Sequence, residues 1–162
     1  MIRIRKLRAA MALGTLAAAS AHAISMPPLR EGLWERHWVS SSLPGSEKDD
    51  TTTQICRNHA GDQAAWDASR KIPGCSFLKE NLTSGRYTAE IRCVIGNVTL
   101  NESTSGTYRD TSVHTETHVR YAPDFYGKTE QTEIMDFKYL GNCPGDMKPG
   151  DMRLQDGSIR HP

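Results

Sequence analysis

The clearest evidence for the fold lies in residues 75–121, CSFLKENLTSGRYTAEIRCVIGNVTLNESTSGTYRDTSVHTETHVRY. Threonine, valine, isoleucine and tyrosine dominate it, in short runs separated by turn residues such as Ser84-Gly85 and Gly96-Asn97. Such spacing is typical of antiparallel strands joined by tight turns. It predicts strands at about 75–82, 86–95, 97–109 and 111–121, and another at about 128–140 after a turn at Pro123-Asp124.

Two further strands and a helix precede this stretch. Residues 32–39 and 51–56 alternate or are β-branched, and Leu43-Pro44-Gly45-Ser46 joins them as a hairpin. The alanine-rich segment from Asn58 breaks the alternation, so one short helix is expected at about 58–71, anchored to the sheet by Trp66. The fold class is therefore mainly β, a single antiparallel meander with one short helix. A bent sheet, a small sandwich and a partly closed barrel all fit this pattern.

The two ends of the chain differ in composition from its middle. Four basic residues, an alanine-rich apolar run and the triplet Ala21-His22-Ala23 predict a signal peptide at 1–23, cleaved after Ala23. No later segment has the length and hydrophobicity of a membrane span. Residues 24–143 then form the β domain. Residues 144–162, with two Pro-Gly-Asp-Met repeats, are expected to be a flexible tail.

The charge of the mature chain argues against one class of partner. The leader carries four of the 20 Lys and Arg residues and none of the 19 Asp and Glu residues, so its removal leaves a formal charge of −3. Nucleic-acid binding requires a cluster of basic residues on one face. A mildly acidic chain without such a cluster is not expected to bind nucleic acid.

Four cysteines, Cys56, Cys75, Cys93 and Cys143, predict two disulfides, because an oxidising compartment preserves them and no C-x-x-C metal pair occurs. A turn centred on Ser84 would place Cys75 opposite Cys93, and elimination then pairs Cys56 with Cys143. A register slip of one residue would remove this argument, so the other two connectivities stay open.

His114, Glu116 and His118 lie on one face of a predicted strand, which raises the question of a metal site. The two histidines would stand about 13 Å apart along an extended strand, too far to share one ion. Either of them could join Glu116 and a neighbouring residue such as Glu130 or Glu133. A solvated sheet face is the simpler interpretation of this row, so no metal and no other cofactor is predicted.

Two aromatic groups are the candidate ligand-binding residues. Trp34 and Trp38 flank Arg36 on one strand face, and Tyr121, Phe125 and Tyr126 surround a predicted turn. Aromatic side chains offer a large contact area to apolar or sugar ligands, and curved sheets often bind ligands at their mouths. The competing interpretation places the tryptophan pair in the core and the other three as a plug at a barrel end.

Several short motifs together resemble a known family. They are Gly32-Leu33-Trp34-Glu35, a strand that ends at Cys56, a helical insert, the spaced pair Cys75 and Cys93, and Gly141-Asn142-Cys143. Over about residues 31–143 the chain resembles the bacterial exported family catalogued as domain of unknown function 3617. It departs from that pattern in its longer tail and in a first loop without Pro/Met-rich character. The resemblance implies a Gram-negative envelope, hence the periplasm, supports two disulfides, and supplies no catalytic residue.

Three functions are compatible with these features, and catalytic motifs are absent from the sequence. The leading hypothesis is a non-enzymatic periplasmic module that binds a small apolar ligand or an envelope partner. The first alternative is a hydrolase-like envelope enzyme that uses Glu116 or Glu133 with His114 or His118, and it requires a histidine in a concave pocket. The second is a structural interaction protein, which would have no cavity. The sequence leaves the oligomeric state open.

Overall fold

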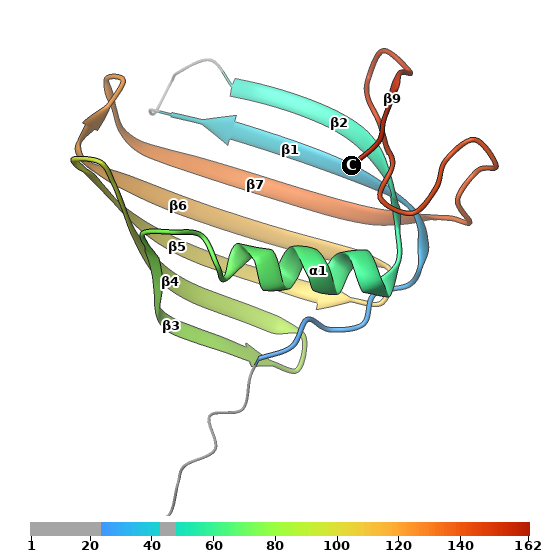
Figure 1. Ribbon diagram of the computed structural model, residues 1–162, viewed down its shortest axis with the longest axis horizontal. Helices are drawn as coiled ribbons and strands as arrows, with labels where there is room; N and C mark the ends of the chain where they lie inside the picture. The colour runs from blue at the N-terminus through green and yellow to red at the C-terminus, as the bar shows by residue number, and fades with distance from the viewer. Residues whose placement is uncertain (1–23, 43–47) are drawn as a thin grey trace, which may run out of the picture.

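A computed structural model describes residues 24–42 and 48–162, and these form one antiparallel sheet with one helix (Figure 1). The predicted signal peptide and the predicted hairpin turn Leu43-Pro44-Gly45-Ser46 lie outside the described residues. The helix α1 spans His59–Ser69. The strands are β1 (Gly32–Ser41), β2 (Lys48–Arg57), β3 (Cys75–Thr83), β4 (Arg86–Ile95), β5 (Val98–Arg109), β6 (Ser112–Phe125), β7 (Lys128–Gly141), β8 (Met152–Arg153) and β9 (Ile159–Arg160).

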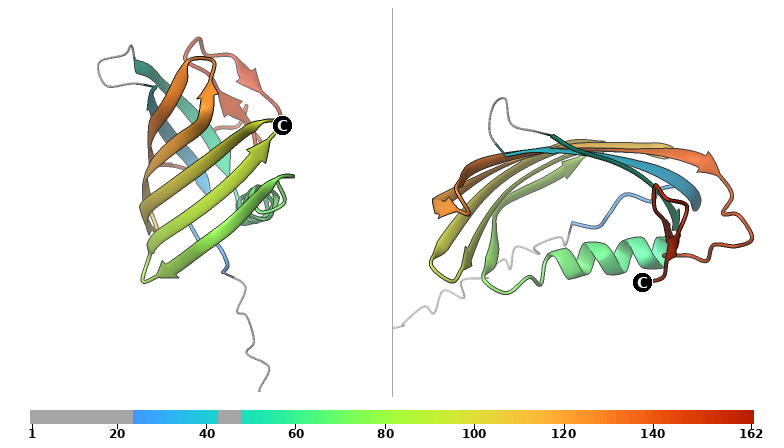
Figure 2. Two further views of the ribbon diagram at one scale, coloured as in Figure 1. Left: turned by 90° about the vertical axis from the view of Figure 1, so that its left-hand side faces the viewer. Right: turned by 90° about the horizontal axis from the view of Figure 1, so that it is seen from above.

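The strand order in the sheet is β3-β4-β5-β6-β7-β1-β2-β8-β9. Strands β3 to β7 follow one another as the predicted meander, and the hairpin of β1 and β2 then pairs with β7 rather than continuing at the other edge. Because β3 and β9 end the sheet without pairing with each other, the sheet is open. Of the three architectures that the sequence left open, the bent sheet is correct, and Figure 2 shows it arching over α1.

The cysteine pairing follows from a turn and a bulge that act together. Ser84 and Gly85 both have positive φ, 52° and 74°, as in the two-residue turns that fit the twist of hairpins. Such a turn alone would place Cys75 opposite Val94. An irregularity between Phe77 and Lys79 shifts the register by one residue, so that Cys75 faces Cys93. Both predicted disulfides, Cys75–Cys93 and Cys56–Cys143, are present, although the turn differs from the one centred on Ser84 that the sequence suggested.

Strand β6 is longer than predicted. The expected turn at Pro123-Asp124 lies within the strand, and the chain turns instead at Tyr126-Gly127, where both φ values are positive, 51° and 78°. The pairing of β6 with β7 is irregular between Arg120 and Phe125. A proline without an N–H group is tolerated in such an interrupted stretch of ladder, so Pro123 did not end the strand.

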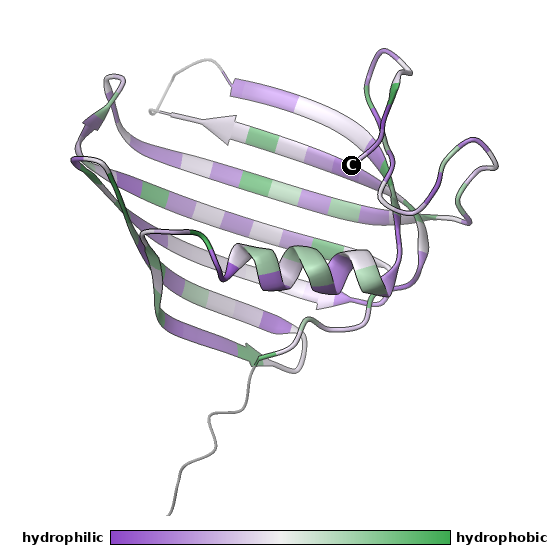
Figure 3. Ribbon diagram, in the orientation of Figure 1, coloured by the Kyte–Doolittle hydropathy of each residue, from purple (hydrophilic) through white to green (hydrophobic). Residues whose placement is uncertain are grey.

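The two faces of the sheet differ in what they contact. Hydropathy alternates along the central strands (Figure 3), as expected when successive side chains point to opposite faces. Helix α1 lies along the concave face (Figure 1). Asn58 caps the helix as predicted, because its side chain accepts a hydrogen bond from the Gly61 N–H at 2.9 Å. Trp66 anchors it to the sheet, with its ring centroid 5.5 Å from that of Tyr87 in β4.

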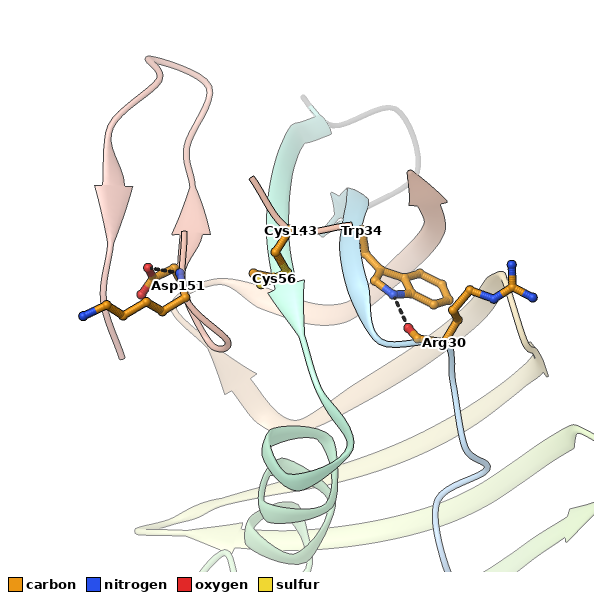
Figure 4. The surroundings of a disulfide bond; sticks show 6 residues. Arg30, Trp34, Cys56, Cys143 and Asp151 are labelled. Carbon is orange, nitrogen blue, oxygen red and sulfur yellow. Dashed lines mark hydrogen bonds between the residues drawn. A yellow bond between two sulfur atoms is a disulfide. The ribbon is translucent and has the colours of Figure 1, made fainter. Parts of the chain in front are cut away.

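A small apolar core closes one end of the concave face. Its buried members are Leu29, Trp34 and Val113. The Trp34 side chain is 0% exposed, and its indole N–H donates to the Arg30 carbonyl at 2.8 Å, as Figure 4 shows. The segment before β1 therefore crosses the end of the sheet and covers it. Trp34 is a core residue, which is one of the two roles that the sequence allowed.

Residues 144–162, predicted as a flexible tail, extend the sheet beyond β2. Strand β8 pairs with β2 and β9 pairs with β8. The Cys56 N–H donates to the Asp151 carbonyl at 3.0 Å, close to the Cys56–Cys143 disulfide (Figure 4). Asp151 itself is buried, and its carboxylate accepts a hydrogen bond from the Lys148 N–H at 2.7 Å. That bond lowers the pKa of Asp151 most strongly, and His161 lowers it further.

Candidate functional site

A cavity of about 560 Å³ lies between α1 and the concave face of the sheet. This volume is within the range of small-molecule sites, roughly 300–1,000 Å³. The cavity extends along the helix, because its lining includes Met26 and Asp62 near the start of α1 and Ile72 and Cys75 beyond its end. The remaining lining residues come from α1 and from strands β2 to β7, and they are Arg57, Ala65, Trp66, Ser69, Phe77, Tyr87, Ile91, Glu102, Thr104, Tyr108, Val113, Thr115, Thr117, Met135 and Phe137.

Polar contacts tie the C-terminal end of α1 to β3 and β4. Arg70, at the end of the helix, forms an ion pair with Glu80, and the Tyr87 hydroxyl donates to the same carboxylate at 3.0 Å. The Arg70 guanidinium also lies over the Trp66 ring, 3.9 Å from its centroid. Burial, and next the hydrogen bond to Glu80, raise the pKa of Tyr87 well above its ordinary value. An ion pair, a hydrogen bond and a cation–ring contact therefore hold the end of α1 against β3 and β4 on this side of the cavity.

A second ion pair closes the other end of the cavity. The Arg57 Nε donates to the Asp62 carboxylate at 2.9 Å, and the two side chains are only 10% and 15% exposed. The Arg57 guanidinium lies 5.3 Å from the Trp34 ring centroid and 5.0 Å from that of Phe137. The charges of Arg57 and Asp62 therefore balance each other at a place where the helix meets the core.

A strip of hydrogen-bonded polar side chains crosses the floor of the cavity. The Thr104 hydroxyl donates to the Glu102 carboxylate at 3.0 Å and lies 3.0 Å from the Thr117 hydroxyl. Directly across the ladder from Glu102 are Ile91 and Val119, which are aliphatic. The strip gives the cavity floor one carboxylate between apolar neighbours.

The predicted group of Trp34, Arg36 and Trp38 shares the concave face with the cavity but does not line it. Trp38 pairs with Met135, which lines the cavity, and directly opposed residues of a ladder point to the same face. The Arg36 Nε is buried without a hydrogen-bond partner in the described ranges. The ligand contact predicted for these three residues stays a prediction.

The predicted group of Tyr121, Phe125 and Tyr126 does form one cluster. The Phe125 ring centroid lies 5.8 Å from that of Tyr121 and 4.6 Å from that of Tyr126. Burial, followed by the charges of Glu133 and Glu102, raises the pKa of Tyr121. The cluster lies at the β6–β7 turn and does not line the cavity, so its role as a ligand contact also stays a prediction.

Exposed apolar side chains gather at the end of the molecule where α1 stops. The connections from α1 to β3, from β4 to β5 and from β6 to β7 all reach this end, at the left of Figure 1. Ile72 in the first of them is half exposed and also lines the cavity. Val94, Ile95, Phe125 and Tyr126, in the other two connections and the strand ends next to them, are also large apolar residues with exposed side chains. Of these five residues only Ile72 lines the cavity, so the rim of the cavity on this side includes one exposed apolar side chain.

The histidine row lies on the convex face, away from α1. The His114 Nδ1 is 2.7 Å from the Asp136 carboxylate and the His118 Nε2 is 3.0 Å from that of Glu116. The two histidine side chains are 49% and 57% exposed, and His118 borders a depression on this outer surface. Residues 24–42 and 48–162 contain no group of three or more side chains placed to hold a metal ion. The solvated-face interpretation of the row fits this geometry.

Sequence reasoning missed most of the cavity floor, although a signal for it existed. Val113, Thr115 and Thr117 were recognised as the face opposite the histidines. Extending that face through the ladder places Tyr108 opposite Val113 and Thr104 opposite Thr117, and both line the cavity. The alternation was therefore readable from the sequence, but the position of α1 over this face was not.

Comparison with known proteins identifies one matching family model. A family model described as "Protein of unknown function (DUF3617)" matches residues 29–143. Neither the curated proteins nor the solved structures contain a match to this chain.

The helix in the described ranges is too short and too polar to cross a membrane.

Proposed function

We propose that this chain, which belongs to the DUF3617 family of proteins of unknown function, binds a small, largely apolar molecule in the cavity under α1 without catalysing a reaction. The observation that carries the proposal is the cavity itself, about 560 Å³ and walled mainly by aromatic and aliphatic side chains. Burying apolar ligand surface there is favourable by about 25 cal/mol for each Å² removed from water. The exposed Ile72 side chain at the rim supports passage of such a ligand at that end.

The alternatives have less support. The hydrolase hypothesis required His114 or His118 in a concave pocket beside a carboxylate. Both side chains are about half exposed on the convex face, and the depression that His118 borders there is separate from the cavity under α1. A purely structural interaction protein predicts no cavity, whereas the described residues form one that is partly open to solvent. An envelope partner would fit the exposed apolar side chains at the end where α1 stops, but it would leave the cavity without a role.

We propose the periplasm as the place of action. The support is the predicted signal peptide at 1–23 together with the two cysteine pairs at bonding distance, which persist in an oxidising compartment. A fusion of the full chain to a reporter that is active only after export would test this, and deletion of residues 1–23 should abolish the signal.

A larger side chain on α1 that fills the cavity tests whether the ligand binds there. Ala65 lines the cavity, whereas its neighbour Ala64 does not, so Ala65→Phe and Ala64→Phe form a matched pair on one helix. Isothermal titration with 1-decanol as the probe should show binding by the wild type and by A64F, and at least a tenfold weaker affinity in A65F. Equal binding by both variants would place the probe elsewhere and contradict the proposal.

A further inference from the structure

The charges of the residues that line the cavity do not cancel. There are three of them, and Arg57 and Asp62 are paired with each other at 2.9 Å. The third, Glu102, has no Lys, Arg or His nitrogen within 4.0 Å among the residues that the structure describes. The lining therefore carries one net negative charge in a largely apolar space.

The Glu102 carboxylate also has unused hydrogen-bonding capacity. An ionised carboxylate can accept about four hydrogen bonds. Among the residues that the structure describes, Glu102 accepts one, from the Thr104 hydroxyl at 3.0 Å. Its opposite neighbours Ile91 and Val119 have no side-chain donors. A partly buried carboxylate with so few partners is costly, and a cation that enters the cavity would offset this cost.

The aromatic side chains around the Glu102 carboxylate also favour a positively charged ligand. Aromatic ring faces attract cations, and this attraction is stronger where water is excluded. Five aromatic side chains line the cavity, namely Trp66, Phe77, Tyr87, Tyr108 and Phe137. Arginine side chains already lie over Trp66, Phe77 and Phe137. Among the described residues no arginine lies over Tyr87 or Tyr108, whose rings pack edge-to-face against each other.

From this charge imbalance we infer that the cavity selects a monocationic amphiphile, an apolar body with one ammonium group that pairs with Glu102. The inference rests on the proposed function, since it names the chemical class of the ligand for the same cavity. An anionic amphiphile of equal length would bring a second negative charge beside Glu102 and is disfavoured. A neutral one would gain the apolar contacts without the ion pair.

The test compares three probes of equal chain length, decylammonium, 1-decanol and decanoate, by isothermal titration at neutral pH and below their micelle-forming concentrations. The wild type should bind decylammonium at least tenfold more tightly than 1-decanol, and decanoate the most weakly. Glu102→Gln should remove the preference for decylammonium and leave the affinity for 1-decanol within about twofold. Glu133→Gln is the matched control: it removes the same charge from the same face, outside the cavity lining, and should keep the preference.

The outcomes separate this inference from the proposed function. Equal affinity for the three probes, or a cation preference that survives in E102Q, would overturn the role of Glu102 while cavity binding stands. Absence of binding of any probe, or binding that A65F does not weaken, would overturn the proposed function itself. Circular dichroism of each variant distinguishes lost binding from lost folding, and Glu102→Asp, which keeps the charge, should retain part of the preference.

Discussion

The two faces of strand β6 carry opposite chemistry on adjacent residues. On the concave face, Val113 is buried in the core and Thr115 and Thr117 line the cavity. On the convex face, His114, Glu116 and His118 are exposed and bond to neighbouring polar side chains. The residues of greatest chemical interest in the sequence therefore lie on the face without the cavity. Threonine, an unremarkable strand residue, forms much of its floor.

Reactive residue types are therefore a poor guide to the site when a sheet has one solvated face. Histidine and glutamate are frequent on such faces because they remain hydrated there. Position relative to the covering helix decides which face encloses space. Stability should depend on the concave face and tolerate change on the convex one.

The largest effect should come from placing the same side chain on each face in turn. Val113→Asn removes a buried apolar contact and buries an amide, so we expect it to lower the free energy of unfolding by about 3–5 kcal/mol. His114→Asn, one residue away, should change it by no more than about 0.5 kcal/mol, as is usual for exposed positions. Chemical denaturation of both variants measures this, and similar losses would contradict the assignment of the faces.

A smaller effect is expected at the cavity wall, and it depends on pH. Tyr87→Phe removes the hydrogen bond to Glu80 and should cost about 1 kcal/mol at neutral pH. Because the folded-state pKa of Tyr87 is raised above the ordinary value of 10.0, its contribution is fully present below pH 10 and is lost as the pH rises further.

Denaturation midpoints at pH 8 and about pH 11 test this coupling. The wild type should lose more stability over that interval than Y87F, because only the wild type must keep this buried phenol neutral. Burial also raises the pKa of Tyr108. Because Tyr108 is present in both the wild type and Y87F, the difference in stability loss between these two proteins is specific to Tyr87. Equal losses would show that Tyr87 ionises as freely in the fold as in the unfolded chain.

The smallest effect is expected for the ion pairs of the convex face. Exposed pairs contribute about 0–1 kcal/mol, and salt screens them. Asp136→Asn, which breaks the contact with His114, should therefore change the free energy of unfolding by less than about 0.5 kcal/mol. Urea denaturation at low and high salt would detect a larger or salt-independent loss, which would mean that the convex face is coupled to the fold after all.

Much of the fold was predictable because the alternation and the turn residues are local signals. All seven long strands and the helix were expected within a few residues of their observed bounds. The cysteine pairing was predicted from an assumed turn, and the bulge between Phe77 and Lys79 compensated for the actual one. No local pattern reveals such a bulge, nor the pairing of β1 with β7, which joins segments about a hundred residues apart.

The candidate site was less predictable than the fold. Its floor needs the register of five strands, and its roof needs the placement of α1, which the contacts of Trp66 and Arg70 determine. Aromatic clustering in the sequence pointed instead to Trp34, which fills the core, and to Tyr126 at an exposed turn. A cavity is a property of packing between distant segments, so residue types alone do not show where it forms.

Binding in the cavity under α1 is tested most directly by native mass spectrometry of the protein purified from cells, beside A65F and A64F. We expect a stoichiometric small-molecule adduct on the wild type and on A64F, and none on A65F. An unliganded wild type that also fails to take up added 1-decanol, or an adduct that A65F retains, would contradict binding in the cavity under α1.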